Sequence, residues 1–363
     1  MQEYDTKKSE HKESLLEEKQ LDDSSSSQSE EKKEVLDIID GTRDENIQEE
    51  PDEAKLTQDN NENGKNGSNI LSTEPSVHEN KVNESVCSEI YETASHICFA
   101  VKVRGLSHIK NGSNCQDAFC CKKVSINGKD IIIVGVADGH GHKNHFLSEH
   151  GAQFAVECIC KIFESYGDKY NNIDDLYATV QNDFPFELYQ AWCESVEIDY
   201  AERYPEERSE NKIEIHEKYG TTAMFCLVIE NEFIFGKLDG NITFYKKNDY
   251  FEPIKDDDEL MGAEAYSLCA KEHALNKWSF DRLRDADFLI LSTDGLRNSF
   301  GVDKNPVHFY NAISVIYEYI CKYGEPVARD ALPEFLSRCT NRGSGDDLTV
   351  CCIRTNSSEK MST

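Results

Sequence analysis

The stretch IIIVGVADGHGHKNHF, residues 131–146, changes character within a few residues. Residues 131–137 are branched or small apolar residues, a run typical of a strand buried on both faces. The run stops at Asp138, and Gly139, His140 and Gly141 follow at once. An Asp-Gly pair alone is an ordinary turn signal. A binding role for Asp138 therefore depends on whether other acidic residues stand in similar places.

Acidic residues recur at the ends of other predicted strands. Asp294 ends the apolar run DFLILST, whereas Asp117 and the pair Asp346-Asp347 each come just before a strand. Strand ends that meet at one edge of a sandwich would bring these carboxylates together, where their charges repel unless cations compensate. Hard oxygen ligands favour Mg²⁺ or Mn²⁺ over zinc. The pattern predicts a divalent-cation site.

The remaining elements follow from the periodicity of apolar residues. Strands are predicted at 97–106, 117–126, 130–138, 221–230, 231–238, 241–247, 287–293 and 347–355, and Asp239-Gly240 is a hairpin signal. Helices are predicted at 146–165, at 173–204 with a break near Pro185, at 306–322 and at 326–340.

Hairpin-paired strands with helices in separate blocks indicate an α+β fold, because a parallel sheet would alternate strands with helices. We expect a central antiparallel β-sandwich with helices on both faces, formed by residues 94–356 as one domain. Residues 1–93 are rich in charged and small polar residues and are expected to be a disordered acidic region. Residues 357–363 are expected to be a short disordered tail.

Charge limits the partners that the chain can have. Its 363 residues carry a formal net charge of -30, from 69 acidic and 39 basic residues. Such a chain is expected to bind neither nucleic acid nor an anionic membrane. No run approaches the roughly 20 apolar residues that span a bilayer, and the start has no signal-peptide pattern. We expect a monomer in the cytoplasm or nucleus, whose acidic N-terminal region could bind a regulator.

The 14 cysteines are interpreted as reduced. Several lie inside apolar runs, such as Cys226 in TTAMFCLVI and Cys351-Cys352 in LTVCCI, where a thiol acts as a small hydrophobic group. Zinc-type pairs of C-x-x-C spacing are absent from the sequence.

Six short motifs occur in order along residues 98–354. They are N-C-Q-D-A (114–118), V-A-D-G-H-G (136–141), Y-G-T-T-A (219–223), G-K-L-D-G (236–240), L-S-T-D-G-L (291–296) and G-S-G-D-D-L-T-V (343–350). The series resembles the metal-dependent type 2C protein serine/threonine phosphatases, in particular the branch with glutamine before the first aspartate. That resemblance implies a β-sandwich fold and metal-dependent hydrolysis of phosphoserine and phosphothreonine in proteins by a metal-bridging hydroxide.

The resemblance also implies roles for individual residues. Asp138 would bridge two Mg²⁺ or Mn²⁺ ions, and His140 would be the general acid that protonates the leaving oxygen. The other metal ligands would be the Gly139 carbonyl, Asp294, Asp346 and, through water, Asp117.

Four positions depart from the family pattern. Gly112 stands where the family places a phosphate-gripping arginine; Arg104, His108 or Lys110 could replace it, and His108 is the first choice. Asn298 stands where an acid would hold a third metal ion. Asp239 is interpreted as a turn residue, and Asp347 as a cap or a supporting acid.

Two functions remain open at this stage. The first is an active phosphatase acting on phosphoproteins. The second is a catalytically impaired pseudophosphatase that serves as a binding or regulatory module. The retained, mutually repelling aspartates favour the first.

Overall fold

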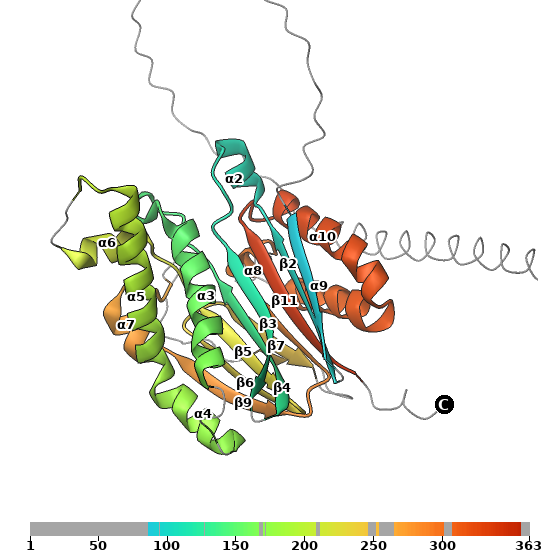
Figure 1. Ribbon diagram of the computed structural model, residues 1–363. Coiled ribbons are helices and arrows are strands. Elements are labelled where there is room, and N and C mark those ends of the chain that lie inside the picture. The colour runs from blue at the N-terminus through green and yellow to red at the C-terminus, as the bar shows by residue number, and fades with distance from the viewer. Residues whose placement is uncertain are drawn as a thin grey trace, which may run out of the picture. The chain divides into compact units, whose positions relative to one another are not determined.

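The computed structural model describes residues 86–93, 95–126, 128–166, 170, 172–207, 211–245, 252–253, 265–300 and 307–356 (Figure 1). All of these residues belong to one compact unit, Asn83–Thr363. The predictions of disorder for residues 1–85 and 357–363 concern positions outside the described residues. No described helix is both long and apolar enough to cross a lipid bilayer.

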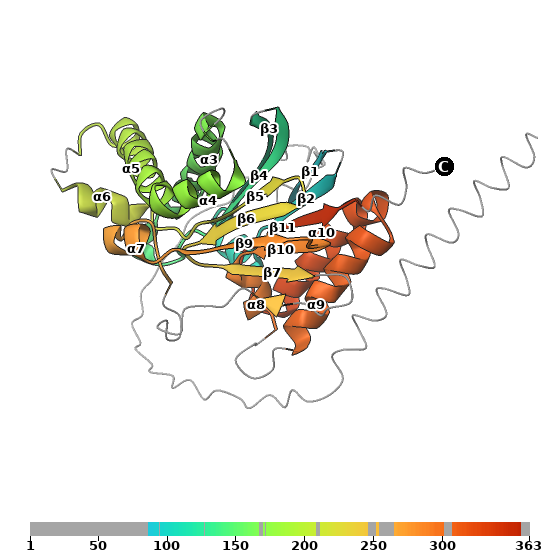
Figure 2. The same cartoon turned by 90° about the horizontal axis from the view of Figure 1, so that it is seen from below.

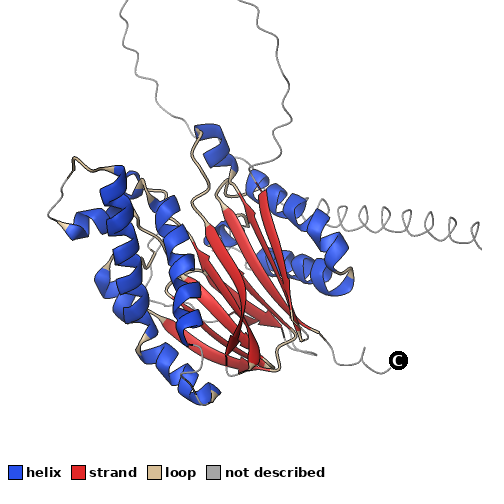
Figure 3. Cartoon of the chain, in the orientation of Figure 1, coloured by secondary structure: helices blue, strands red, loops and turns tan. Residues whose placement is uncertain are grey.

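Two antiparallel sheets form the centre of the unit (Figure 3). The first has the order β1-β2-β11-β10-β7-β8 and the second has the order β3-β4-β5-β6-β9. The strands are β1 (Val86–Glu92), β2 (His96–Val103), β3 (Ala118–Ile126), β4 (Lys129–Ala137), β5 (Met224–Ile229), β6 (Glu232–Lys237), β7 (Asn241–Tyr245), β8 (Glu252–Pro253), β9 (Ser279–Arg284), β10 (Phe288–Ser292) and β11 (Leu348–Thr355).

Helices cover both outer faces (Figure 2). On the second sheet, α3 packs against β3 and β4, and α5 packs against α3; on the first sheet, α10 packs against β1 and β2. The helices are α2 (Leu106–Asn111), η1 (Lys143–His145), α3 (Ser148–Tyr166), α4 (Ile173–Asn182), α5 (Phe184–Arg203), α6 (Lys212–Lys218), α7 (Lys271–Asn276), α8 (Asp294–Asn298), α9 (Val307–Tyr317), η3 (Glu318–Lys322) and α10 (Glu325–Arg342). The predicted α+β sandwich with helices on both faces is confirmed.

Strand β4 shows why its sequence is apolar without alternation. Successive side chains of a strand point to opposite faces. Ile132, Val134 and Val136 therefore enter the core between the two sheets, while Ile131 and Ile133 enter the core beneath α3. Both faces of the strand are buried. Cysteines contribute to the same cores as free thiols, and all 14 are unbonded.

The folded unit begins earlier than predicted. Residues 86–92 form β1, which pairs along its whole length with β2, so the predicted boundary at residue 94 is wrong. The sequence VCSEIYE gives little sign of this, because none of its residues is buried and the strand depends on backbone pairing with β2. The predicted break near Pro185 is confirmed: α4 ends at Asn182, and Pro185 lies in the first turn of α5, where its missing N–H costs nothing.

Candidate active site

Asp138 lies just after β4 and is held through its backbone. Its N–H donates to Thr222 Oγ1 at 3.0 Å, and its carbonyl accepts from the Thr222 N–H at 2.8 Å and from Thr221 Oγ1 at 2.9 Å. Both threonines belong to the Y-G-T-T-A motif, which leads into β5. These three hydrogen bonds fix the backbone of Asp138 at the end of β4 and leave its carboxylate free of them.

Gly139 lies where three segments meet. Its N–H donates to the Gln116 carbonyl at 3.2 Å, and it forms an isolated β-bridge with Thr221. A Cβ atom at this position would lie 2.7 Å from Gln116 O and 2.8 Å from Ser148 O. Only glycine fits such a close approach. The D-G-H-G sequence therefore packs the segment before β3 and the start of α3 around Asp138.

Asp117 is buried, with 2% of its surface exposed. Thr293 donates its hydroxyl to Asp117 Oδ2 at 2.8 Å, which links this aspartate to the end of β10. The other oxygen, Oδ1, has no hydrogen-bond partner within the described part of the chain. A buried, unpartnered carboxylate oxygen is costly.

The predicted carboxylates influence one another. Burial, followed by the charges of Asp117, Asp294 and Asp346, raises the pKa of Asp138 well above its usual range. Burial and then the charge of Asp347 raise the pKa of Asp117, and burial and then Asp294 raise that of Asp346. The four strand-end aspartates of the sequence prediction are thus brought together.

This arrangement is not a ready-made chelate. Across the described residues, no three or more His, Cys, Asp or Glu side chains form a group that could hold a metal ion as they stand. The available donors are carboxylate and carbonyl oxygens, the set that Mg²⁺ and Mn²⁺ prefer. Burial is the larger cause of the raised pKa values of Asp117, Asp138 and Asp346, and repulsion from neighbouring carboxylates adds to it.

Asp347 connects three parts of the site. Its carboxylate accepts hydrogen bonds from Gly105 N at 2.7 Å, from Gln116 N at 2.6 Å and from His108 Nδ1 at 2.7 Å. Burial acts to raise the pKa of Asp347, but the hydrogen bonds from His108, Gly105 and Gln116 lower it overall. The interpretation of Asp347 as a supporting acid agrees with these contacts.

His108 lies on α2, and its ring is oriented by Asp347. The hydrogen bond to Asp347 is the main reason why the pKa of His108 is raised. Arg104 is half-buried and donates through Nη2 to the His108 carbonyl at 3.3 Å, while Lys110 is exposed on the same helix. Gly112 caps α2 in a left-handed conformation with φ of 72°. An arginine would be strained there, which explains in physical terms the departure at this position.

His140 is enclosed by other groups. Its backbone N–H donates to the Gly220 carbonyl at 3.0 Å. The centroid of its ring lies 5.1 Å from the centroid of the His145 ring. His145 Nδ1 in turn hydrogen-bonds the Glu217 carbonyl. Burial, followed by the influence of His145, lowers the pKa of His140 to about 4. The ring is therefore neutral at pH 7 when no ligand is bound.

A family model described as protein phosphatase 2C matches residues 104–337. The chain belongs to the protein phosphatase 2C family. Membership confirms the family that its motifs resemble and the predicted enzyme class, a protein serine/threonine phosphatase. No curated protein sequence matches the chain significantly.

Solved structures with a similar fold include three phosphatases. A serine-threonine phosphatase 2C from Toxoplasma gondii is 13% identical, with a TM-score of 0.46, over 75% of this chain and 99% of its own. The catalytic domain of the serine threonine protein phosphatase PstP, solved with 2 manganese ions, is 17% identical, with a TM-score of 0.45, over 72% and 99%. A bacterial serine phosphatase is 14% identical, with a TM-score of 0.46, over 72% and 98%.

Two further positions of this phosphatase 2C chain follow from local geometry. Both oxygens of Asp239 accept backbone N–H groups, from Gly240 at 2.7 Å and Tyr266 at 3.0 Å, as a turn residue does. Asp294 begins α8 and Asn298 ends it four residues later, so the two positions share one face of the helix, one turn apart.

Sequence reasoning missed the hydroxyl groups that hold these aspartates. Thr222 fixes Asp138, and Thr293 contacts Asp117. Both belong to motifs that the sequence displays, Y-G-T-T-A and L-S-T-D-G-L. Their partners lie 84 and 176 residues away along the chain, and local spacing carries no information about such pairs.

Proposed function

We propose that this chain hydrolyses phosphoserine and phosphothreonine in proteins with two Mg²⁺ or Mn²⁺ ions. The ions would be held by Asp117, Asp138, Asp294, Asp346 and the carbonyl of Gly139. One observation carries the proposal: neighbouring carboxylates add to the effect of burial in raising the pKa values of Asp138 and Asp117, and the buried Asp117 Oδ1 has no hydrogen-bond partner in the described residues. Divalent cations would convert this repulsion into attraction.

Bound cations would supply an acidified water as nucleophile and positive charge opposite the phosphoryl oxygens. The chain's own residues would orient the substrate. His108, fixed through Nδ1 by Asp347, keeps Nε2 for a phosphate oxygen and would replace the arginine that Gly112 excludes. Arg104 supports α2 through the His108 carbonyl, so we assign it a supporting role; Lys110 is exposed on α2.

His140 would protonate the leaving serine or threonine oxygen, a contribution of roughly 10²–10⁴ in rate. Its pKa of about 4 leaves the ring neutral at pH 7 without substrate. An adjacent phosphate dianion would raise that pKa, because an opposite charge favours the protonated imidazole. Proton donation would therefore be coupled to substrate binding.

The remaining expectations are part of the same proposal. Phosphoproteins are the substrates, and the enzyme acts as a monomer in the cytoplasm or nucleus. A regulator binds the acidic N-terminal region. The alternative function, a pseudophosphatase acting as a binding module, rests on the glycine at position 112.

Hydrolysis of p-nitrophenyl phosphate with Mn²⁺ tests the proposal. The wild type should turn over, and Asp138→Asn and Asp294→Asn should each lose activity by about 10²-fold or more, because each removes a ligand charge. Asp130→Asn is a matched control on the other end of β4, where Asp130 is exposed and paired with Lys123. Wild-type activity no higher than that of the two site variants would favour the pseudophosphatase.

A further inference from the structure

Two segments that border the proposed site contain no acidic residue. They are residues 105–116, which include α2, and residues 139–148, which include η1. Elsewhere the chain is strongly acidic, with 69 Asp and Glu among 363 residues, or about one residue in five. The 12 residues of one segment and the 10 of the other therefore add no negative side chain of their own on the two sides of the site.

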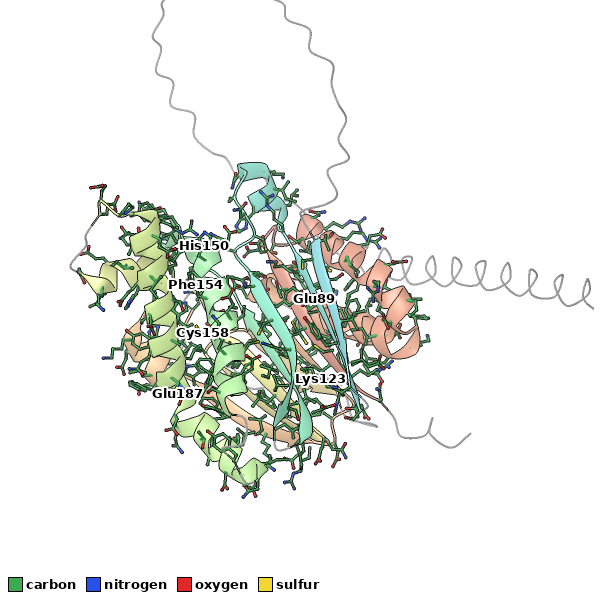
Figure 4. All side chains as sticks on the ribbon, in the orientation of Figure 1. Glu89, Lys123, His150, Phe154, Cys158 and Glu187 are labelled. Carbon is green, nitrogen blue, oxygen red and sulfur yellow. The ribbon has the colours of Figure 1, made fainter. Side chains whose placement is uncertain are left out.

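The two segments are neighbours in space. Gly139 N donates to the Gln116 carbonyl at 3.2 Å, and Asn114 Nδ2 donates to Glu149 Oε2 at 3.0 Å, just past the second segment. Figure 4 shows His150, near the start of α3, at the same end of the domain as α2. The two segments thus meet at Gln116 and Gly139, next to Asp117 and Asp138, and we treat their exposed side chains as one surface beside the carboxylates.

This surface carries lysine side chains that are not neutralised by a neighbouring acid in the described part of the chain. Lys110 and Lys143 are exposed, and neither forms an ion pair within the described residues. Lysines on the second sheet differ, since Lys122 pairs with Glu164, Lys123 with Asp130 and Lys129 with Glu230. An unpaired lysine keeps its full field for an approaching ligand.

The two glutamates at the border of this surface, Glu149 and Glu217, each accept a hydrogen bond from an asparagine amide. Asn114 donates to Glu149, and Asn144 donates to Glu217 at 3.3 Å. Apolar side chains complete the surface: Phe146 is 54% exposed and Ile109 is 44% exposed. We call the set of Ile109, Lys110, Lys143 and Phe146 the α2–η1 face.

We propose that the α2–η1 face binds the polypeptide on either side of the phosphorylated residue and selects acidic and apolar flanking residues. The lysines attract flanking carboxylates and repel basic residues, whereas Phe146 and Ile109 gain burial under an apolar side chain. This inference rests on the proposed function, because it names the substrate class of that site.

Matched phosphopeptides test the selection. One peptide carries Glu and Leu beside phosphothreonine, a second has Lys in place of Glu, and a third has Ala in place of Leu. For the wild-type chain, kcat/KM should be at least about tenfold higher for the first peptide than for the second. Lys143→Glu should reduce that ratio to near one or invert it. Phe146→Ala should remove the difference between the first and third peptides.

Lys161→Glu is the control, because Lys161 is an exposed lysine of α3 that pairs with Glu157. It makes the same charge change and should leave the ratio as in the wild type. A wild type without preference, or an unchanged ratio in Lys143→Glu, overturns the proposal.

The proposal can still be tested if the chain proves not to be an active phosphatase. If the wild type does not turn over p-nitrophenyl phosphate with Mn²⁺, binding of the labelled peptides by fluorescence anisotropy replaces kcat/KM. Tighter binding of the acidic peptide that is lost in Lys143→Glu still supports the face, whereas equal binding overturns it. Displacement of the phosphopeptide by the unphosphorylated segment DDSSSSQSEE, residues 22–31, at equal concentration would make the chain's own N-terminal region the occupant and overturn the proposal.

Discussion

Thr222 holds both backbone groups of Asp138: its hydroxyl accepts the Asp138 N–H at 3.0 Å, and its own N–H donates to the Asp138 carbonyl at 2.8 Å. Thr221 adds a third bond from its hydroxyl to the same carbonyl at 2.9 Å. Asp138 is central to the proposed metal site, so the direction of its carboxylate depends on a residue outside the proposed set of metal ligands.

Replacing Thr222 should therefore weaken metal binding. Thr222→Val leaves the Asp138 N–H without an acceptor, and loss of such a supporting bond costs about 10–100-fold in metal affinity. Thr222→Ser keeps the oxygen and should bind Mn²⁺ like the wild type. Calorimetric titration with Mn²⁺ measures both. Equal affinity of the valine and serine variants would contradict this positioning role.

The metal-free protein should lose stability as pH rises. Asp117, Asp138 and Asp346 have pKa values raised above the unfolded value of 3.8, so the folded state binds more protons than the unfolded state. The contribution of these three groups to folding stability is fully present below the unfolded pKa of 3.8. It is lost as the pH rises through their pKa values in the folded state. Mn²⁺ should stabilise the fold more at pH 7.5 than at pH 5, because the ligands must be deprotonated. Thermal unfolding with Mn²⁺ and with a chelator measures this; a larger Tm gain at pH 5 would argue against it.

His96 should produce the opposite pH dependence. Its ring is buried beside Phe233, and burial lowers its pKa to about 4 from 6.5. The unfolded state therefore binds the proton first, and stability falls as pH drops from 6.5 to 4, by up to about 3 kcal/mol. His96→Phe should flatten this part of the curve. Urea unfolding of the two metal-free proteins across this range gives the comparison, and parallel curves would refute the assignment.

Restoring the family arginine should not help this enzyme. Gly112 has φ of 72°, so Gly112→Arg places a side chain in the left-handed region at a cost of roughly 1–2 kcal/mol and loosens the end of α2. We expect lower stability and no gain in kcat/KM for p-nitrophenyl phosphate. Gly112→Asn is the control, because asparagine tolerates this conformation. His108→Ala should lower kcat/KM clearly; a gain of activity in Gly112→Arg would mean that His108 does not take the place of the arginine.

Much of the sandwich could be read from local sequence. The uninterrupted apolar run of β4 reflects burial on both faces, and Pro185 marks the start of α5 because proline is best tolerated in the first helical turn. β1 could not be read in this way. Its residues are largely exposed, and its stability comes from hydrogen bonds to β2 that any sequence can make.

The sequence by itself determined the family and the set of acidic residues, because short motifs combine a strand end, a glycine and a carboxylate within a few positions. Only the tertiary structure decided what supports them. Thr222 reaches Asp138, and Asp347 reaches His108 across 239 residues, through contacts that depend on how the strands are stacked. Periodicity records which side of an element is buried, but it does not record which distant residue lies against it.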